Sequence, residues 1–182
     1  MARLAQIDAT PASGRSRELL EAIEAKFGRT PNIAKVIANS PVALEAYVGF
    51  SSAVQGLHTP RLREQIALAV AETNGCSYCL SAHTAAGRFV GLSGQEIVEA
   101  RAGFSHDARE NAALAFARKL AELRGRVPEQ DVDALRAEGF SDAEIIEIVA
   151  LVALNLFTNT VGLATKPDVD YPLVEPGLAQ AA

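Results

Sequence analysis

Four residues in the middle of the chain could together carry out thiol redox chemistry: Glu64, Cys76, Cys79 and His83. The two cysteines are the only ones in the sequence. If residues 76–90 form a helix, Cys76, Cys79 and His83 follow an i, i+3, i+7 pattern and share one face. Residues three apart in a helix have Cβ atoms within about 5–6 Å, so the two sulfurs can form a disulfide with little adjustment. The spacing therefore predicts a Cys76–Cys79 disulfide.

Such a disulfide would contribute little as a structural cross-link. In the chain-entropy model a loop of this size stabilises a protein by only roughly 2 kcal/mol, less than a loop that spans a domain. Gly75 precedes Cys76, so we expect Cys76 in the first turn of its helix, where unpaired N–H groups and the positive end of the helix dipole stabilise a thiolate. A reversible, reactive disulfide is the favoured interpretation.

His83 and Glu64 are placed to move the protons of these thiols. His83 lies one turn beyond Cys79, and an imidazole can both accept and donate a proton near pH 7. Glu64 lies on the preceding predicted helix and faces the cysteine helix if the two pack antiparallel. A carboxylate there would orient the histidine, as a third group orients the base in other nucleophilic sites.

The same residues allow three other interpretations. Cys76, Cys79, His83 and Glu64 are also potential zinc ligands, but no second C-x-x-C pair completes the usual site. Covalent haem attachment requires histidine directly after the second cysteine, where Leu80 stands. Two buried, inert cysteines are the third alternative, because free cysteine packs as a small apolar residue. We favour the redox pair and expect no metal and no cofactor.

Length, charge and composition indicate a cytoplasmic globular protein. A chain of 182 residues is long enough for one compact domain. With a net charge of −5 and basic residues spread among acidic ones, it lacks the positive surface that nucleic-acid binding requires. No secretory signal or long uninterrupted apolar segment is evident, so we expect neither secretion nor a membrane span.

Apolar residues recur at intervals of three and four, which predicts an all-α fold. Cap residues, prolines and glycines mark the helix ends, with Ser93, Ser105 and Ser141 as expected N-caps. We predict a helical domain over residues 1–165, with its cysteine-containing centre at 60–90, and an extended tail over 166–182. The expected helices are Ser16–Phe27, Ile33–Asn39, Val42–Val54, Arg61–Asn74, 76–90, 93–102, 105–123, Glu129–Glu138 and Asp142–Leu163.

The last predicted helix is apolar on nearly all sides between Ile145 and Phe157. A helix that packs one face against a core needs apolar residues on that face only. We expect this helix either to lie at the centre of the fold or to contribute to a subunit interface.

The segment REQIALAVAETNGCSYCLSAHTAAG, residues 63–87, resembles alkylhydroperoxidase D and the peroxidase-related members of the carboxymuconolactone decarboxylase superfamily. The tail sequence DVDYP is similar in a looser way. The resemblance implies an all-helical fold that assembles into trimers or hexamers, with Cys79 attacking peroxide and Cys76 resolving the product. It also implies a proton relay formed with Glu64 and His83. The chain departs from the best-known alkylhydroperoxidases at Tyr78, where they have histidine, so that residue's role is not carried over.

The sequence thus predicts a thiol-dependent hydroperoxide reductase that is reset by an external dithiol or an adaptor protein of unknown identity. A reductase of protein or small-molecule disulfides is the alternative within enzymes. A helical oligomeric scaffold without turnover is the alternative outside them. We expect a hydroperoxide substrate and further copies of the chain as partners, and neither nucleic acid nor membrane.

Overall fold

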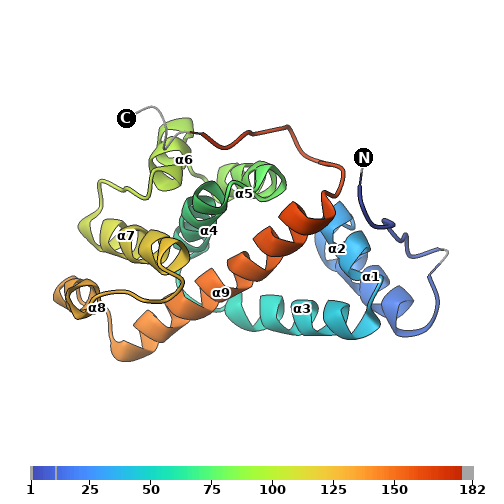
Figure 1. The fold of residues 1–182 in the computed structure, drawn as a ribbon, viewed down its shortest axis with the longest axis horizontal. Coiled ribbons are helices and arrows are strands. Elements are labelled where there is room, and N and C mark those ends of the chain that lie inside the picture. Colours follow the sequence, from blue (N-terminus) through green and yellow to red (C-terminus); the bar gives the residue numbers. More distant parts are fainter. Residues whose placement is uncertain (1, 11, 178–182) are drawn as a thin grey trace.

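The computed structural model describes residues 2–10 and 12–177, and this part of the chain contains nine α-helices and no strand. Figure 1 shows α9 running diagonally through the molecule, with α4 to α8 on one side and α1 to α3 on the other. The all-α prediction is confirmed. The helices are α1 (Gly14–Phe27), α2 (Asn32–Ile37), α3 (Pro41–Val54), α4 (Pro60–Asn74), α5 (Ser77–Phe89), α6 (Gly94–Arg101), α7 (Ala108–Glu122), α8 (Glu129–Ala137) and α9 (Asp142–Thr165).

Side-chain caps determine where most of these helices begin. The Thr59 hydroxyl accepts a hydrogen bond from the backbone N–H of Leu62 at the start of α4. Ser93 and Ser141 begin α6 and α9 with complete capping boxes. The expected cap at Ser105 is wrong, because the side chain of Asp107 caps α7 instead. The Ser105 hydroxyl accepts from the Asp107 N–H and donates to the Glu110 carboxylate in the first turn of α7.

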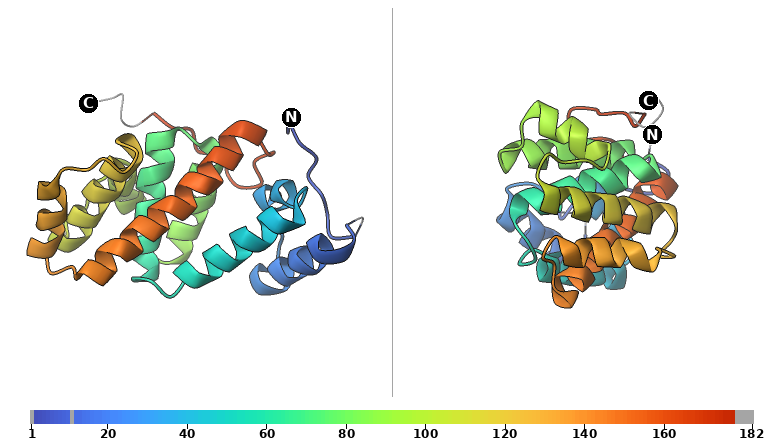
Figure 2. Two further views of the ribbon diagram at one scale, coloured as in Figure 1. Left: turned by 60° about the horizontal axis from the view of Figure 1, so that its bottom comes forward. Right: turned by 90° about the vertical axis from the view of Figure 1, so that its left-hand side faces the viewer.

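The helix α4 is the centre of the domain. It packs against α5, α6, α7 and α9, and every residue from Gln65 to Glu72 is buried. Four helices therefore pack around α4, which passes through the middle of the molecule (Figure 2). Because α4 is held so completely, a side chain on it has a fixed position relative to α5, which follows after a short connection.

The long helix α9 has one buried and one exposed apolar face. Its buried side chains, among them Ile148, Leu151 and Val152, pack toward the core. Its exposed apolar side chains include Ile146 and Phe157, which are 67% and 39% exposed. By length and composition alone α9 could cross a membrane. It packs against α2, α3, α4, α5, α7 and α8, so its place within the helical domain accounts for the apolar residues of its buried face.

Residues 166–177 follow α9 without helical structure and cross the molecule from α2 to α6 (Figure 1). Asp168 bonds the side chain of Gln6 near the N-terminus, and the Val174 N–H donates to the Ser81 hydroxyl on α5. The Gly177 N–H donates to Glu72 on α4 at 2.6 Å. The extended segment thus ties the N-terminal helices to the helix that carries the cysteines. Residues 178–182 of the predicted tail lie outside the described residues.

The exposed face of α9 predicts self-association. Burial of Ile146, Val149, Phe157 and neighbouring apolar side chains against another copy would remove them from water, each with a gain of about 1.5–3 kcal/mol when fully buried. Light scattering at micromolar concentration should therefore give a mass that is a multiple of 19.2 kDa. Ile146→Glu combined with Val149→Glu should yield a monomer.

Leu123→Glu provides the matched control for that experiment. Leu123 is also an exposed apolar residue, at 40%, but it follows α7 and lies outside α9. This variant should keep the parent mass. A parent protein that is monodisperse at 19.2 kDa would contradict the prediction.

Candidate active site

The cysteines lie where α4 ends and α5 begins. Gly75 terminates α4 in the left-handed conformation, with φ of 69°, which glycine adopts without strain. Cys76 is the N-cap of α5, and its sulfur accepts the Cys79 N–H at 3.3 Å. The expected position of Cys76 inside the first helical turn is therefore wrong by one residue. Its sulfur nevertheless lies at the helix N-terminus, where partial positive charge favours a thiolate.

Cys76 and Cys79 are joined by a disulfide, with their Cα atoms 5.3 Å apart. Both are buried, at 1% and 3% exposure. The bond spans a single turn and connects no separate parts of the fold. The structure therefore contains the disulfide that the spacing predicts.

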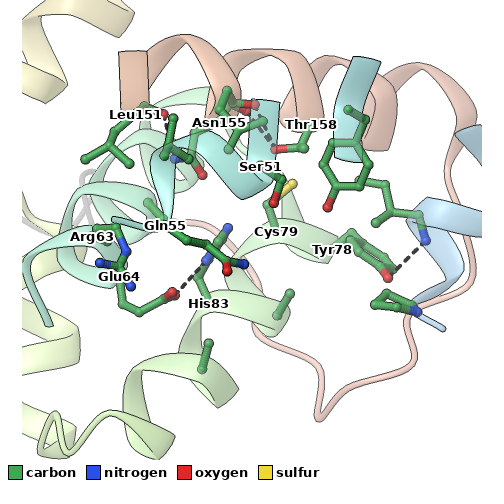
Figure 3. Close-up of a pocket in the computed structure, with 18 of the residues that line it drawn as sticks. Ser51, Gln55, Arg63, Glu64, Tyr78, Cys79, His83, Leu151, Asn155 and Thr158 are labelled. Carbon is green, nitrogen blue, oxygen red and sulfur yellow. Dashed lines mark hydrogen bonds and ion pairs between the residues drawn. The ribbon is translucent and has the colours of Figure 1, made fainter. Parts of the chain in front are cut away.

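His83 and Glu64 are in direct contact. Nδ1 of His83 on α5 lies 2.8 Å from Oε2 of Glu64 on α4 (Figure 3). An ionised carboxylate only accepts hydrogen bonds, so Nδ1 carries the proton in this pair and Nε2 is left for another partner. Both side chains remain partly accessible, at 27% and 21%. The predicted packing of α4 against α5 is present, and it brings Glu64 and His83 together.

A cavity of ≈ 320 Å³ joins these groups. Cys79, His83 and Glu64 line it, whereas Cys76 does not (Figure 3). Cys79 is thus the sulfur that a small molecule in the cavity would meet, and Cys76 lies behind it. The rest of the cavity wall comes from α2 and the residue before it, from α3, α4, α5 and α9, and from the extended segment. These residues are Pro31, Ile33, Tyr47, Ser51, Val54, Gln55, Arg63, Ala67, Tyr78, Ala82, Ala86, Leu151, Leu154, Asn155, Thr158 and Tyr171.

Several polar residues of this wall were not predicted from the sequence. Arg63 precedes Glu64 and donates from Nη1 to the carbonyls of Leu57 and His58, which fixes the connection into α4. Asn155 is a buried polar residue in the apolar helix α9, and its Nδ2 donates to the Leu151 carbonyl. An asparagine inside an otherwise apolar segment is the one sequence signal that could have indicated it.

Tyr78 has a mainly structural role. Its hydroxyl donates to Oδ1 of Asp170 at 2.8 Å and accepts the Ile33 N–H at 3.1 Å. The side chain is 5% exposed, and burial raises the pKa of its phenol above the ordinary value. Its ring also meets Tyr171 edge-on at 5.9 Å. Tyr78 therefore links α5 to α2 and to the extended segment, and it remains protonated near pH 7.

Gly162 on α9 packs directly against the disulfide. A Cβ atom placed on Gly162 would lie 2.9 Å from the Cys76 sulfur and 3.6 Å from the Cys79 sulfur. Real side chains do not approach so closely, so only glycine allows α9 to cover the disulfide at this distance. The sequence pattern gave no indication of this contact, because Gly162 lies far from the cysteines along the chain.

Within residues 2–10 and 12–177, no group of three or more histidine, cysteine, aspartate or glutamate side chains is arranged to hold a metal ion. Cys76 and Cys79 are bonded to each other, and Glu64 bonds His83. The four residues considered as zinc ligands thus pair among themselves.

Comparison with known proteins agrees with this arrangement. The sequence model described as Carboxymuconolactone decarboxylase family matches residues 41–122, which include all four predicted site residues. A peroxidase-related protein from Silicibacter sp. TM1040 is 30% identical, with a TM-score of 0.79 over 92% of this chain and 91% of that one. The chain belongs to the carboxymuconolactone decarboxylase family. Its fold is that of the alkylhydroperoxidase D-like members.

Two further solved structures share the fold. A peroxidase-related protein from Ralstonia eutropha JMP134, described as having an alkylhydroperoxidase AhpD core, is 24% identical, with a TM-score of 0.81 over 93% of this chain and 92% of that one. The debrominase Bmp8, solved in complex with 2,3,4-tribromopyrrole, is 22% identical, with a TM-score of 0.72 over 90% and 87% of the two chains. No curated protein matches the chain significantly. The carboxymuconolactone decarboxylase fold therefore accommodates more than one chemistry.

The contact of Gly162 with the disulfide predicts a redox-dependent effect of Gly162→Ala. Overpacking costs about 1–3 kcal/mol, whereas alanine in a helix interior gains about 1 kcal/mol over glycine. In the oxidised protein the Cys76 sulfur is held by the disulfide and the clash should dominate. In the reduced protein the thiol can rotate away. Urea unfolding should therefore show a larger loss of stability for the oxidised variant than for the reduced one.

Gly49→Ala is the matched control, because Gly49 lies within α3 and a Cβ atom there meets nothing within 4 Å. This variant should change the stability of both redox forms alike, in the stabilising direction. Equal effects of Gly162→Ala on the two redox forms would show that Gly162 does not press on the disulfide.

Proposed function

We propose that this chain is a thiol-dependent hydroperoxide reductase in which Cys79 is the attacking thiol. The observation that carries the proposal is the common cavity of Cys79 and His83, with Glu64 bonded to the histidine and Cys76 directly behind. A nucleophile, a base and a group that orients the base are the parts such a reaction needs. The similarity to peroxidase-related proteins supports the same class of reaction.

The first step is attack of the Cys79 thiolate on the hydroperoxide. A sulfur electron pair forms an S–O bond with the terminal oxygen, the O–O bond breaks, and the other oxygen leaves as an alkoxide. His83 supplies the proton it took from the thiol, and the alkoxide becomes an alcohol. Cys79 is thereby oxidised to a sulfenic acid and the hydroperoxide is reduced.

The second step uses Cys76. Its thiolate attacks the Cys79 sulfur, an S–S bond forms, and the sulfenic hydroxyl leaves with a proton as water. The partial positive charge at the N-terminus of α5 favours the Cys76 thiolate. Since Cys76 already caps this helix and lies next to Cys79, the bond forms without unfolding.

An external dithiol then restores the pair. Each of its thiols is oxidised, its own disulfide forms, and Cys76 and Cys79 regain their protons by two successive exchange reactions. The balance is one hydroperoxide and one dithiol converted to one alcohol, one water and one disulfide. A reducing cytoplasm supplies such dithiols, and we place the protein there.

The alternatives differ in the oxidant that the reduced protein accepts. A disulfide reductase would react faster with small or protein disulfides than with peroxide, and a scaffold would react with neither. The fold shared with a debrominase makes 2,3,4-tribromopyrrole a further compound to offer. Stopped-flow measurement of thiol oxidation by each compound distinguishes these functions, and the proposal requires the hydroperoxides to react fastest.

Substitution of each cysteine tests the assigned roles. The reduced parent should consume one equivalent of hydroperoxide and lose both thiols. Cys79→Ser should consume none, because the remaining thiol does not line the cavity. Cys76→Ser should still consume one equivalent and retain a sulfenic acid that dimedone traps, as mass spectrometry of the peptide would show. Consumption by Cys79→Ser at the parent rate would reverse the assignment.

Glu64→Gln tests the proton relay. The amide keeps nearly the same shape but no longer offers His83 a carboxylate, so oxidation should slow and its pH profile should change. General acid–base catalysis contributes typically about 10²–10⁴-fold, so a loss below about threefold would be too small for a member of the relay. His83→Ala should slow the same step. If the pair acts as one unit, the double variant should be little slower than the slower single variant.

A stability measurement separates catalysis from packing at Glu64. If Glu64→Gln lowers the melting temperature strongly while the rate per folded molecule stays unchanged, the residue is structural and leaves the proposed site. Gln65→Glu is not a suitable control, because Gln65 is buried. Glu45→Gln is better, since Glu45 is exposed on α3 and forms a surface ion pair with Arg15.

A further inference from the structure

A second cavity adjoins the one that contains Cys79. It measures ≈ 840 Å³ and lies between α1, α3 and α5, within the range of about 300–1,000 Å³ that is typical of small-molecule sites. Ile23, Phe27, Val48 and Phe89 are among its mostly apolar lining. Phe89 is 92% exposed, so its ring is available to a bound molecule.

The two cavities adjoin and share part of their walls. Tyr47, Ser51, Gln55, Ala82 and Ala86 line both of them. Ala82 precedes His83 in the chain, and Ala86 lies one turn further along the same helix. A molecule with its reactive group at Cys79 would therefore pass along these shared residues of α3 and α5 to reach the second cavity.

The two cavities differ in chemical character. The first contains Cys79, the His83–Glu64 pair and polar side chains from α9. The second is lined mostly by alanine, aliphatic and aromatic side chains, with Ser51, Ser52 and Gln55 as neutral polar residues and Lys26 and Arg29 as its basic residues. This distribution fits a molecule with a polar reactive group, a long apolar portion and a negative charge.

Of the two basic residues, Lys26 is the one available to an anion. Arg29 is already bonded to the Asp170 carboxylate and stacks 4.4 Å from the Tyr171 ring centroid. Lys26 donates to Oε1 of Gln55 at 2.9 Å and lies 5.3 Å from the Phe27 ring centroid, so its partners in the described part of the chain are neutral. Its ammonium group therefore still attracts a carboxylate, and Gln55 places it beside the passage between the two cavities.

We propose that the second cavity binds the apolar chain of a free fatty-acid hydroperoxide, with Lys26 pairing with its carboxylate and the hydroperoxide reaching Cys79. This inference rests on the proposed function, because it names the substrate class of the same site. The reaction is the one written above, so the products are the hydroxy fatty acid, water and the oxidised dithiol. A medium-chain or long-chain acid is required, since a small hydroperoxide would leave the second cavity empty.

Binding can be measured without any reaction. Calorimetry on the oxidised protein with saturated carboxylates from octanoate to tetradecanoate should show affinity rising with chain length, by up to about fourfold per methylene buried. Methyl esters of the same acids should bind more weakly by about two- to fivefold, the value of one exposed ion pair. Lys26→Gln should remove this difference between acid and ester. Lys119→Gln, which removes the same charge from α7, should not.

Blocking the second cavity tests its connection to Cys79. Ser52 lines the second cavity but not the first, so Ser52→Phe should narrow the second cavity and leave Cys79 accessible. Single-turnover oxidation by a free fatty-acid hydroperoxide should become at least tenfold slower at low concentration, while oxidation by hydrogen peroxide and tert-butyl hydroperoxide should be unchanged. Ala53→Phe places the same ring on the neighbouring residue of α3, which lines neither cavity, and should affect no substrate.

The outcomes separate this inference from the proposed function. If the small hydroperoxides are reduced and Ser52→Phe has no selective effect, the inference is wrong and the reductase proposal stands. If carboxylates bind with the expected chain-length dependence but no hydroperoxide oxidises Cys79, the reductase proposal is wrong and the carboxylate site stands.

Two other occupants are also tested. Reduction of phospholipid hydroperoxides in vesicles, without reduction of the free acids, would overturn the choice of a free carboxylate. The second alternative is another copy of the chain. It would be assigned to the second cavity if Ser52→Phe lost the oligomer and the parent protein bound no carboxylate.

Discussion

The close junction between α4 and α5 is the constraint on which the site depends. Gly75 ends α4 in a left-handed conformation and Cys76 caps the next helix immediately, so the chain reverses within two residues. With so short a connection the two helices pack against each other. Glu64, three turns before the end of α4, consequently reaches His83 on α5. The same turn places the Cys76 sulfur against the first N–H groups of α5.

Burial of α4 makes this geometry rigid. Helices on every side hold it, and the Glu64 carboxylate therefore has little freedom relative to the cysteine helix. A hydrogen bond between two partly exposed side chains usually contributes only about 0.5–1.5 kcal/mol to stability, which is too little to determine how two helices pack. The packing of α4 positions the pair, and the hydrogen bond then selects the tautomer of the histidine.

Local patterns in the sequence predicted the helices well, because caps, prolines and glycines act within a few residues. The Ser105 cap failed for a local reason, since Asp107 lies closer to the apolar pattern and its side chain accepts the Glu110 N–H, while Ser105 accepts the N–H of Asp107 itself. The pairing of Glu64 with His83 was also predictable, because both lie on consecutive helices joined by glycine. These predictions required only the spacing of residues along a helix and the short connection between α4 and α5.

Contacts across the fold were not predictable from local patterns. Gly162 and Asn155 approach the cysteine pair from α9, and nothing in their own sequence surroundings specifies which helix they face. The apolar pattern of α9 indicated either central burial or an interface, and the structure shows a buried face and an exposed one. The path of residues 166–177 depends on hydrogen bonds to Arg29 in the connection between α1 and α2, to the start of α2 and to α5, which connect residues more than ninety positions apart in the chain.

Tyr78 lies within the cysteine motif, but its contacts stabilise the fold and keep it from transferring protons. The phenol donates to Asp170 and accepts from Ile33, and burial raises its pKa, so it neither supplies nor takes a proton near pH 7. A histidine at this position could do both. In the proposed reaction the proton transfers at Cys79 would therefore fall to His83, whose Nδ1 is already bonded to Glu64. Only one imidazole nitrogen then remains for the cavity. Under the proposal this single atom would take the thiol proton and later return it to the departing alkoxide, so the two transfers would be sequential and would depend on one residue.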